Sequence, residues 1–265
     1  MKNPFVTLGE MLWKNLTSWR ETFIFWGEIV CSIGLLCRNP KKLRWKNFFY
    51  YLDMCGASAL GIVLLICFLM GITIAFQAAV QMRKFGTEIF VADLTGFSML
   101  KEFGPLMVAL IATGRAGSSF AAEIGSMKAE EEISALTTMG ISPVRFLVVP
   151  KLLAMMISLP ALIVFGDIAG LAGGLAVGVG FLGLTAESYI SRTIEVLTPL
   201  TFLLGVLKGV FFGAMIALVG CREGFRSSPD SQGVGRAATR AVVRAILFLI
   251  IIDTLITVIY SFWGY

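Results

Sequence analysis

The sequence predicts an all-α integral membrane protein with an N-terminal interfacial helix, about five membrane-spanning helices and a helix on the cytoplasmic side. Composition is the first reason: 57% of the 265 residues are hydrophobic and 15% are charged, whereas soluble domains are nearer half apolar and a quarter charged. The mean hydropathy of +0.85 agrees. The second reason is a series of long apolar runs, and the third is the distribution of basic residues between them.

The residue types that are missing or isolated limit the chemistry. The chain has no histidine, which removes the commonest metal ligand and the Ser–His and Cys–His nucleophile pairs. Its cysteines are scattered, without a C-x-x-C pair, and we expect them to pack as small apolar side chains; they are Cys31, Cys37, Cys55, Cys67 and Cys221. We therefore expect no catalytic residue and no metal site. Mild basicity is the only hint of nucleic-acid binding, and membrane topology explains it better.

The first apolar stretch, Glu21 to Cys37, differs from the later ones. At 100° per residue, Glu21, Glu28 and Ser32 fall within about 40° of one another and leave the rest of the helix apolar. Basic residues follow at Arg38, Lys41, Lys42, Arg44 and Lys46. An amphipathic helix with a basic flank is typical of a helix lying in the membrane interface. We expect residues 1–50 to form a cytoplasmic N-terminus with this helix and residues 51–265 a single transmembrane domain; a short first span is the alternative.

Later apolar runs are long enough to cross a membrane, which takes about 20 residues. Four are clear: Gly56–Val80, Gly96–Gly114, Pro199–Gly220 and Ala241–Phe262. A longer stretch, Phe146–Gly183, would reach roughly 57 Å as a helix, too long for one upright span and barely enough for two. Pro150 and Pro160 are expected to bend it.

Basic residues decide between one and two spans in that stretch. With one span, the inner segments hold eight Lys and Arg before residue 50, four in residues 115–151 and five in residues 221–244, against Arg83, Lys84 and Arg192 outside. Two spans would move the last five outside. Because cytoplasmic loops carry the excess of Lys and Arg, the sequence favours five spans with the C-terminus on the far side.

Glycines recur every fourth residue in two of these runs. The first row is Gly166, Gly170, Gly174 and Gly178, and the second is Gly205, Gly209 and Gly213. Rows of small residues let helix backbones approach closely in lipid, so we assign these glycines to packing.

A charged segment, Glu123 to Met139, lies between the second and third spans. Its apolar residues suit a helix with one contact face, and Gly140 and Pro143 supply stop signals. The preceding Gly114–Ser119 is predicted to be a polar, flexible exit from the membrane. Such a helix is either a solvated connector or a docking helix that a soluble partner holds in a groove.

Three stretches of this sequence resemble the MlaE/YrbE family, the permease subunits of ABC transporters that move phospholipid between membranes. Gly114 to Lys128, read as GRAGSSFAAEIGSMK, closely resembles the family signature. Lys101 to Pro105, KEFGP, looks like a family segment in which Phe103 replaces the usual leucine, and Gly233 to Val243 is similar to the segment before the last span. The resemblance covers nearly the whole chain from about residue 20 and keeps the order of elements.

The resemblance implies a homodimer in which each copy has an interfacial elbow helix and a five-span bundle. The segment of about residues 121–140 would be the coupling helix that docks the ATPase, which favours the second interpretation of the charged segment. Its expected coupling residues are Arg115, Glu123, Gly125, Met127, Lys128, Glu131 and Leu136.

Several charges fall inside apolar runs, where ionisable groups are expensive and are functional candidates. Lys101, Glu102, Lys208 and Asp253 are the main ones; the resemblance places these four positions along a central cavity. Asp167 is a weaker candidate, and snorkelling or structural pairing is the alternative for all five. We expect an outward-open lipid cavity at the dimer axis, with walls from Ile74, Gln77, Phe85 and Phe103 and with Lys101 and Glu102 near the headgroup.

The chain lacks any G-x-x-x-x-G-K-[ST] phosphate loop, so ATP hydrolysis is expected on another subunit. We expect no cofactor here, with ATP and Mg²⁺ bound by a partner ATPase. The resemblance further implies an MCE-domain protein on the far side, often a small STAS-domain protein, phospholipid as cargo, and a multi-pass location in the inner membrane of a Gram-negative bacterium.

Two other functional classes stay open from the sequence alone. A secondary transporter or channel for another hydrophobic solute would also be glycine-rich with buried charges, although no inverted repeat is detectable. An intramembrane enzyme or assembly factor is disfavoured by the missing histidine and by the lack of a paired-aspartate motif.

Overall fold

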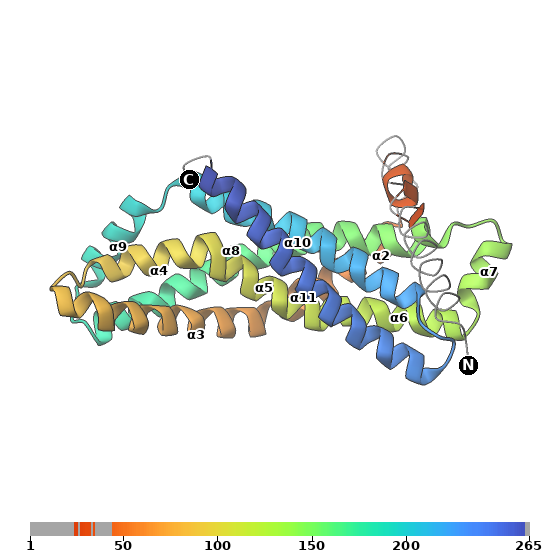
Figure 1. Cartoon of the computed structure of the whole chain (residues 1–265), viewed down its shortest axis with the longest axis horizontal. Helices are drawn as coiled ribbons and strands as arrows, with labels where there is room; N and C mark the ends of the chain where they lie inside the picture. The colour runs from red at the N-terminus through yellow and green to blue at the C-terminus, as the bar shows by residue number, and fades with distance from the viewer. Residues whose placement is uncertain (1–23, 26, 33, 35–43, 263–265) are drawn as a thin grey trace, which may run out of the picture.

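The computed structural model describes residues 24, 25, 27–32, 34 and 44–262, which form a bundle of α-helices without strands. Five helices are long and apolar enough to cross a membrane: Trp45–Phe85, Phe90–Ala129, Val144–Gly180, Pro199–Phe225 and Ser231–Phe262. They run roughly along one long axis (Figure 1). The predicted all-α class and the five spans are confirmed, including the single span in the stretch of Phe146–Gly183.

The first long helix is bent where its polar and apolar parts meet. It consists of α2 (Trp45–Cys55), α3 (Ala57–Met82) and the short 3₁₀ turn η2 (Arg83–Phe85). Gly56 separates α2 from α3, with φ −96° and ψ −86°. The bend lets α2 lie against the beginning of the third long helix, where Tyr51 meets Lys151, while α3 follows the apolar part of the bundle.

The second long helix is interrupted twice without being broken. Its parts are α4 (Phe90–Ser98), η3 (Met99–Phe103), α5 (Gly104–Ala112), η4 (Thr113–Gly117) and α6 (Ser118–Ala129), of which η3 and η4 are π-helical. The prediction of a flexible exit at Gly114–Ser119 is therefore wrong. Thr113, Ala116 and Gly117 are buried within this helix, so tertiary packing overrides the weak helix preference of glycine and serine.

The segment predicted to form one cytoplasmic helix is divided into two. Its first part is the end of α6, and its second is the short α7 (Glu132–Thr138). Glu131 adopts a left-handed conformation with φ 60°, which ends the regular helix between the two. Of these two parts, α7 is the one that projects from the end of the bundle (Figure 1).

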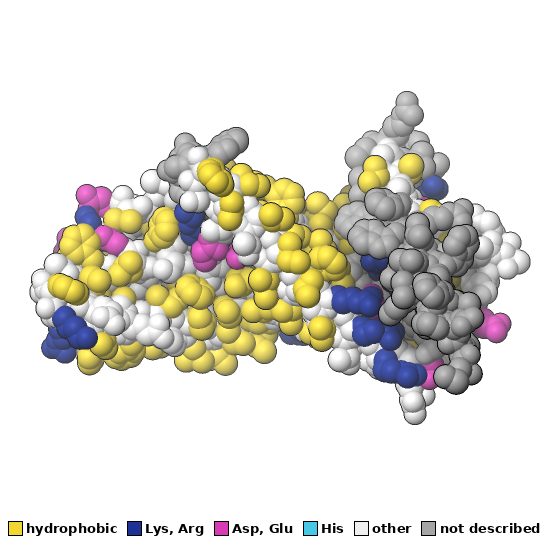
Figure 2. All heavy atoms as spheres, viewed as in Figure 1, with side chains coloured by type: hydrophobic (Ala, Val, Ile, Leu, Met, Phe, Trp, Pro, Cys, Tyr) yellow, Lys and Arg dark blue, Asp and Glu magenta, His cyan; other side chains and the backbone are white. Residues whose placement is uncertain are grey.

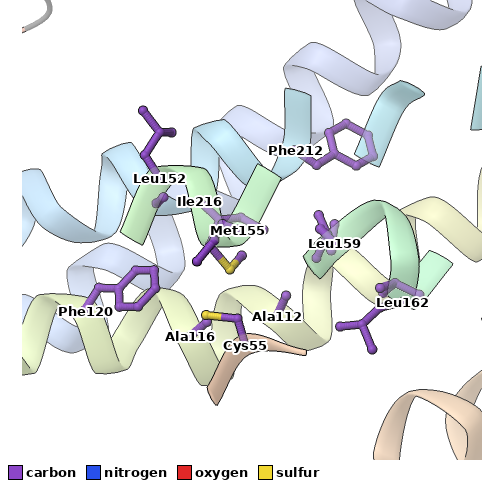
Figure 3. Packing of buried hydrophobic residues seen from close by; sticks show 14 of the residues in the cluster. Cys55, Ala112, Ala116, Phe120, Leu152, Met155, Leu159, Leu162, Phe212 and Ile216 are labelled. Atoms are coloured by element: carbon purple, nitrogen blue, oxygen red, sulfur yellow. The ribbon is translucent and has the colours of Figure 1, made fainter. Parts of the chain in front are cut away.

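The third long helix is the centre of the bundle. It begins with the π-helical η5 (Val144–Val148) and continues as α8 (Val149–Gly180), with Pro160 inside it. In its most apolar stretch 67% of the residues are buried, against 11% in the last helix. Figure 3 shows four α8 side chains, Leu152, Met155, Leu159 and Leu162, in the core between neighbouring helices.

Glycine contacts hold α8 against α3, as the first glycine row predicts. A Cβ atom on Gly71 of α3 would collide with the Gly170 carbonyl, and one on Gly173 would collide with the Phe68 carbonyl. The second row lies on α10 (Pro199–Phe225), where Gly205 faces the Leu100 carbonyl and Gly213 faces the Met155 carbonyl. Backbone contact at these points leaves no room for a side chain.

The remaining elements complete the two ends of the bundle. The short amphipathic α9 (Ala186–Val196) follows α8 at the end away from α7, and α11 (Ser231–Phe262) runs back along the outside (Figure 1). Apolar side chains form a broad band around the middle of the visible face (Figure 2). Large exposed hydrophobic residues on every long helix suit contact with lipid rather than water.

Part of the predicted interfacial helix lies within the described residues, and these are helical. Phe25 packs edge-on against Phe225 of α10 with ring centroids 6.2 Å apart. The Ser142 hydroxyl donates to Glu28 Oε1 at 2.5 Å. Glu21, Cys37, Arg38, Lys41 and Lys42 lie outside the described residues, so the interfacial position of this helix stays a prediction.

Candidate functional site

A polar cluster joins three helices inside the apolar part of the bundle. Lys208 of α10 donates from Nζ to Glu102 Oε2 at 2.8 Å, to Asp253 Oδ1 at 2.9 Å and to the Thr257 hydroxyl at 3.1 Å. It also donates to the Lys101 carbonyl at 3.1 Å, and Thr257 donates to Glu102 Oε1 at 2.9 Å. These residues are called the Lys208 cluster below.

Lys208 is the buried centre of this cluster. Its side chain is 0% exposed, whereas those of Glu102 and Asp253 are 31% and 17% exposed. A lysine at membrane depth is tolerated when paired with acids and hydrogen-bonded. Lys208 therefore fixes the two carboxylates, while their outer edges stay accessible from the surface of the chain.

The π-helical turn η3 supplies the second helix's part of the cluster. It carries Lys101 and Glu102, and its wider turn presents both the Lys101 carbonyl and the Glu102 side chain to Lys208. The Lys101 ammonium lies over the Phe97 ring, 4.7 Å from its centroid. Single π-helical turns are frequent at functional sites, and here the turn creates an interhelical polar contact.

The cluster brings together the four charged residues that were predicted to line a cavity. Lys208, Glu102 and Asp253 are in direct contact, and Lys101 contributes its carbonyl. Of the predicted wall residues, Gln77, Phe85 and Phe103 are exposed and Ile74 is partly buried. Thr257 was missed, because a threonine one turn after Asp253 in an apolar run carries no distinctive signal.

Asp167 is buried separately from the cluster. Its side chain on α8 lies against Gly104 of α5, where a Cβ atom would collide with Oδ1. Neither carboxylate oxygen has a hydrogen-bond partner among the described residues. The geometry gives Asp167 a close packing contact but does not bring it to the Lys208 cluster.

A second buried ion pair joins α6 to the beginning of α8. Lys151 of α8 is fully buried, with Nζ 3.1 Å from Glu123 Oε1 of α6. The Tyr51 hydroxyl of α2 donates to the same oxygen at 2.6 Å, and the Lys151 ammonium faces the Tyr51 and Phe120 rings at 4.7 and 5.7 Å. Sequence reasoning counted Lys151 only as an inner charge, since its neighbours along the chain gave no sign of burial.

The predicted coupling residues occupy different environments. Arg115 donates to the Ser58 carbonyl, and Lys128 donates to the carbonyls of Phe225 and Ser227 at 2.7 and 2.8 Å, which caps α10. Gly125 is buried against Ser227 and Val234, and Met127 is partly buried. Only Glu131 and Leu136 lie beyond the break after α6.

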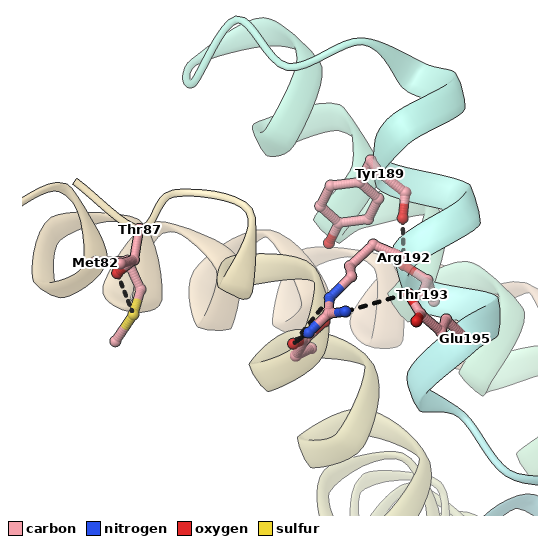
Figure 4. A network of polar contacts seen from close by, with 7 residues as sticks. Met82, Thr87, Tyr189, Arg192, Thr193 and Glu195 are labelled. Carbon is pink, nitrogen blue, oxygen red and sulfur yellow. Dashed lines mark hydrogen bonds and ion pairs between the residues drawn. The ribbon is translucent and has the colours of Figure 1, made fainter. Parts of the chain in front are cut away.

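The opposite end of the bundle has its own polar network. Arg192 of α9 reaches α4 and forms an ion pair with Asp93 at 2.8 Å and with Glu195 at 3.1 Å (Figure 4). The hydrogen bond to Asp93 raises the pKa of Arg192, and burial raises the pKa of the Tyr189 phenol. This network attaches α9 firmly to the second long helix.

Comparison with known proteins assigns the chain to a family. The family model described as Permease MlaE matches residues 48–259, which cover most or all of every long helix and all of the Lys208 cluster. The chain belongs to the MlaE permease family. It is therefore a multi-pass membrane protein and a permease subunit of the ABC transporter class.

Curated relatives agree with this family. A probable ABC transporter permease protein of Rickettsia prowazekii (strain Madrid E) is 35% identical over 202 residues, 76% of this chain and 78% of that protein. The intermembrane phospholipid transport system permease protein MlaE of Haemophilus influenzae (strain ATCC 51907 / DSM 11121 / KW20 / Rd) is 34% identical over 228 residues, 85% of this chain and 87% of that protein. The predicted membership in the MlaE/YrbE family is thus confirmed.

Proposed function

We propose that this chain is the permease subunit of an ATP-driven transporter that moves phospholipids between the inner and outer membranes of a Gram-negative bacterium. The observation that carries the proposal is the Lys208 cluster, a polar site built into the apolar part of the bundle. The named activity of the Haemophilus influenzae relative, intermembrane phospholipid transport, supports the choice of cargo.

A phospholipid needs an apolar surface for its acyl chains and polar groups for its headgroup. Each CH₂ removed from water contributes about 0.8 kcal/mol, which exposed apolar side chains such as Phe103 and Phe85 can supply. Glu102 and Asp253 keep accessible edges and lie close to Lys101 in the fold. We assign headgroup contact to these three, and assign Lys208, which is too buried to touch a ligand, to positioning the carboxylates.

Two copies of the chain would enclose this site. The exposed Gln77, Phe85 and Phe103 have no role in the core of one chain, so they are available to line a cavity at a homodimer axis together with Ile74. An outward opening would let lipid pass between this cavity and an MCE-domain protein on the far side.

The energy would come from a cytoplasmic ATPase that binds ATP and Mg²⁺, with a STAS-domain protein as an additional partner. We place the docking contact on α7 rather than on the whole of residues 121–140. The surface of α7 and of the residues on either side of it combines the acidic Glu130, Glu131 and Glu132 with the exposed Met139 and Ile141. The end of α6 is buried in the bundle, where it would receive movement of α7 and pass it to α8 and α10 through Glu123 and Lys128.

Conservative variants of the two acids test the headgroup assignment. In the complex with its ATPase, Glu102→Gln and Asp253→Asn should each weaken the apparent affinity for the phospholipid that stimulates ATP hydrolysis. The expected loss is tenfold or more, since a hydrogen bond to a charged group contributes roughly 1.5–3 kcal/mol. Basal hydrolysis should be retained. Lys84→Ala, an exposed charge at the outer end, is the control. Wild-type lipid stimulation in both variants would refute the assignment.

Charge reversal on α7 tests docking. Glu132→Arg should reduce co-purification of the ATPase subunit, because Glu132 lies exposed in the first turn of α7. The matched control is Glu187→Arg, which changes the corresponding first-turn acid of the exposed α9 at the opposite end. Gly125 is a poor probe, because a Cβ there would come within 3.3 Å of Ser227 Oγ and disturb the bundle. Equal ATPase recovery with both variants would remove α7 from the interface.

A further inference from the structure

The outer face of α11 carries a row of arginines that the proposed transport site does not use. Arg236, Arg240 and Arg244 recur every fourth residue, with side chains 62%, 44% and 46% exposed. Figure 2 shows dark blue side chains in a row over α11, at the border of the apolar band. The row therefore lies where a bundle surface changes from lipid contact to water contact.

The same stripe of α11 continues as an apolar surface. At 100° per residue, Arg236, Arg240, Arg244, Leu247 and Ile251 fall within about 80° of the helix circumference. Leu247 and Ile251 are 55% and 46% exposed. A guanidinium row followed along one stripe by exposed aliphatic side chains matches the order of a phospholipid, with its phosphate above its acyl chains.

Buried and exposed acids hold the arginines in place. Glu223 of α10 has a side chain only 2% exposed and pairs with both Arg240, at 3.5 Å, and Arg244. Asp230 pairs with Arg236 at 3.4 Å. One carboxylate between two guanidinium groups leaves a net positive charge.

The paired arginines also keep hydrogen-bonding capacity. A guanidinium has five N–H donors in a planar fork, and Glu223 occupies few of those on Arg240 and Arg244 within the described chain. An interhelical clamp would need only one arginine for Glu223. An anionic ligand outside the bundle explains why two arginines are present and why Arg240 and Arg244 are both exposed.

We propose that Arg240 and Arg244, assisted by Arg236, form a binding site for the phosphate of an anionic phospholipid in the surrounding leaflet, whose acyl chain lies along Leu247 and Ile251. Basic clusters next to a spanning helix attract anionic lipid, and this one is fixed in position by Glu223 before the lipid arrives. The site lies on the outside of one chain and does not depend on the transport cavity.

Photo-crosslinking locates the lipid directly. The full chain is reconstituted in phosphatidylcholine vesicles with a trace of diazirine-labelled phosphatidylglycerol or, separately, equally labelled phosphatidylcholine. Peptides containing residues 245–262 are then analysed by mass spectrometry. We expect phosphatidylglycerol to label this segment at least about fivefold more than phosphatidylcholine, and this preference to decline as salt is raised.

Arg240→Gln with Arg244→Gln should abolish the preference. This double change leaves Glu223 buried without a cation. The triple variant that adds Glu223→Gln removes that unpaired charge as well, and it should lose the lipid preference in the same way. Arg83→Gln with Lys84→Gln, the basic pair at the other end, is the matched control and should keep the preference. Glu102→Gln should also keep it, which separates this site from the proposed transport site.

Four results would overturn the proposal. One is equal labelling by the two lipids, and another is a preference that survives in both arginine variants. The third is loss of the preference for phosphatidylglycerol when inorganic phosphate is added, while chloride at the same ionic strength leaves the preference intact. That result would assign the site to free phosphate. If the variants lose the second copy or the ATPase while lipid preference is unchanged, the arginines belong to a protein interface and the proposal also fails.

Discussion

Lys208 shows how one buried charge can organise a membrane-embedded site. Its ammonium reaches the second helix at Glu102 and the last helix at Asp253 and Thr257. Each contact joins two different helices through residues at least 45 positions apart in the sequence. The side chain thus serves both as a structural link and as the group that sets the orientation of two acids.

Removing this lysine should destabilise the chain strongly. Lys208→Met leaves two acids without their cation, and breaking a buried ion pair costs about 3–5 kcal/mol. Thermal unfolding of the purified protein in detergent should show the loss as a lower Tm.

The triple variant Lys208→Met, Glu102→Gln, Asp253→Asn provides the comparison. It should recover most of the stability, because all three replacement side chains are neutral and no unpaired charge is left. Phospholipid should nevertheless fail to stimulate ATP hydrolysis by its complex with the ATPase. If Lys208→Met unfolds at the wild-type temperature, Lys208 is not the link described here.

At this scale the sequence identified charges better than their contacts. Lys101, Glu102, Lys208 and Asp253 stand out because an ionisable residue in an apolar run is rare. Lys151 does not stand out in the sequence, since it follows Pro150 at the start of a span and resembles an ordinary interfacial lysine. Its burial depends on Glu123, Tyr51 and Phe120 from other elements, which one-dimensional periodicity cannot reveal.

At the scale of the elements, the closest contacts between helices occur at glycines. The close approach of α3 and α8 at Gly71 and Gly170 agrees with a row of small residues read from the sequence. The division between α6 and α7 was not readable, because it depends on the left-handed conformation of Glu131, a residue with no intrinsic preference for it. The continuous helix through Gly114–Ser119 was hidden by residues that usually favour loops.

Two glycines on the same helix test this packing. Gly71→Ala should lower the free energy of unfolding by about 1–3 kcal/mol, because the new methyl group meets the Gly170 carbonyl. Gly61→Ala is the matched control, since nothing lies within 4 Å of a Cβ there, and it should be neutral or slightly stabilising. Equal unfolding temperatures for the two variants would contradict the assigned α3–α8 contact.

In the whole molecule, charge and hydrophobicity together predicted the architecture. The distribution of Lys and Arg favoured a single span rather than two within Phe146–Gly183. The structure has one helix there, α8. The residues of the proposed homodimer contact were not predictable from the sequence, because an exposed apolar residue suits lipid and a partner chain equally well. The last helix, α11, is the least buried of the five long helices. Ion pairs join it to α10, Asp253 with Lys208 and Arg244 with Glu223.

The central claim is that two copies hold phospholipid at a site whose polar part is the Lys208 cluster. Native mass spectrometry of the complex, purified in mild detergent, measures both the number of copies and the lipid retained. We predict two copies with bound phospholipid for the wild type, and two copies with markedly less lipid for the Glu102→Gln, Asp253→Asn double variant. A single copy, or the same lipid content in the double variant, would contradict the claim.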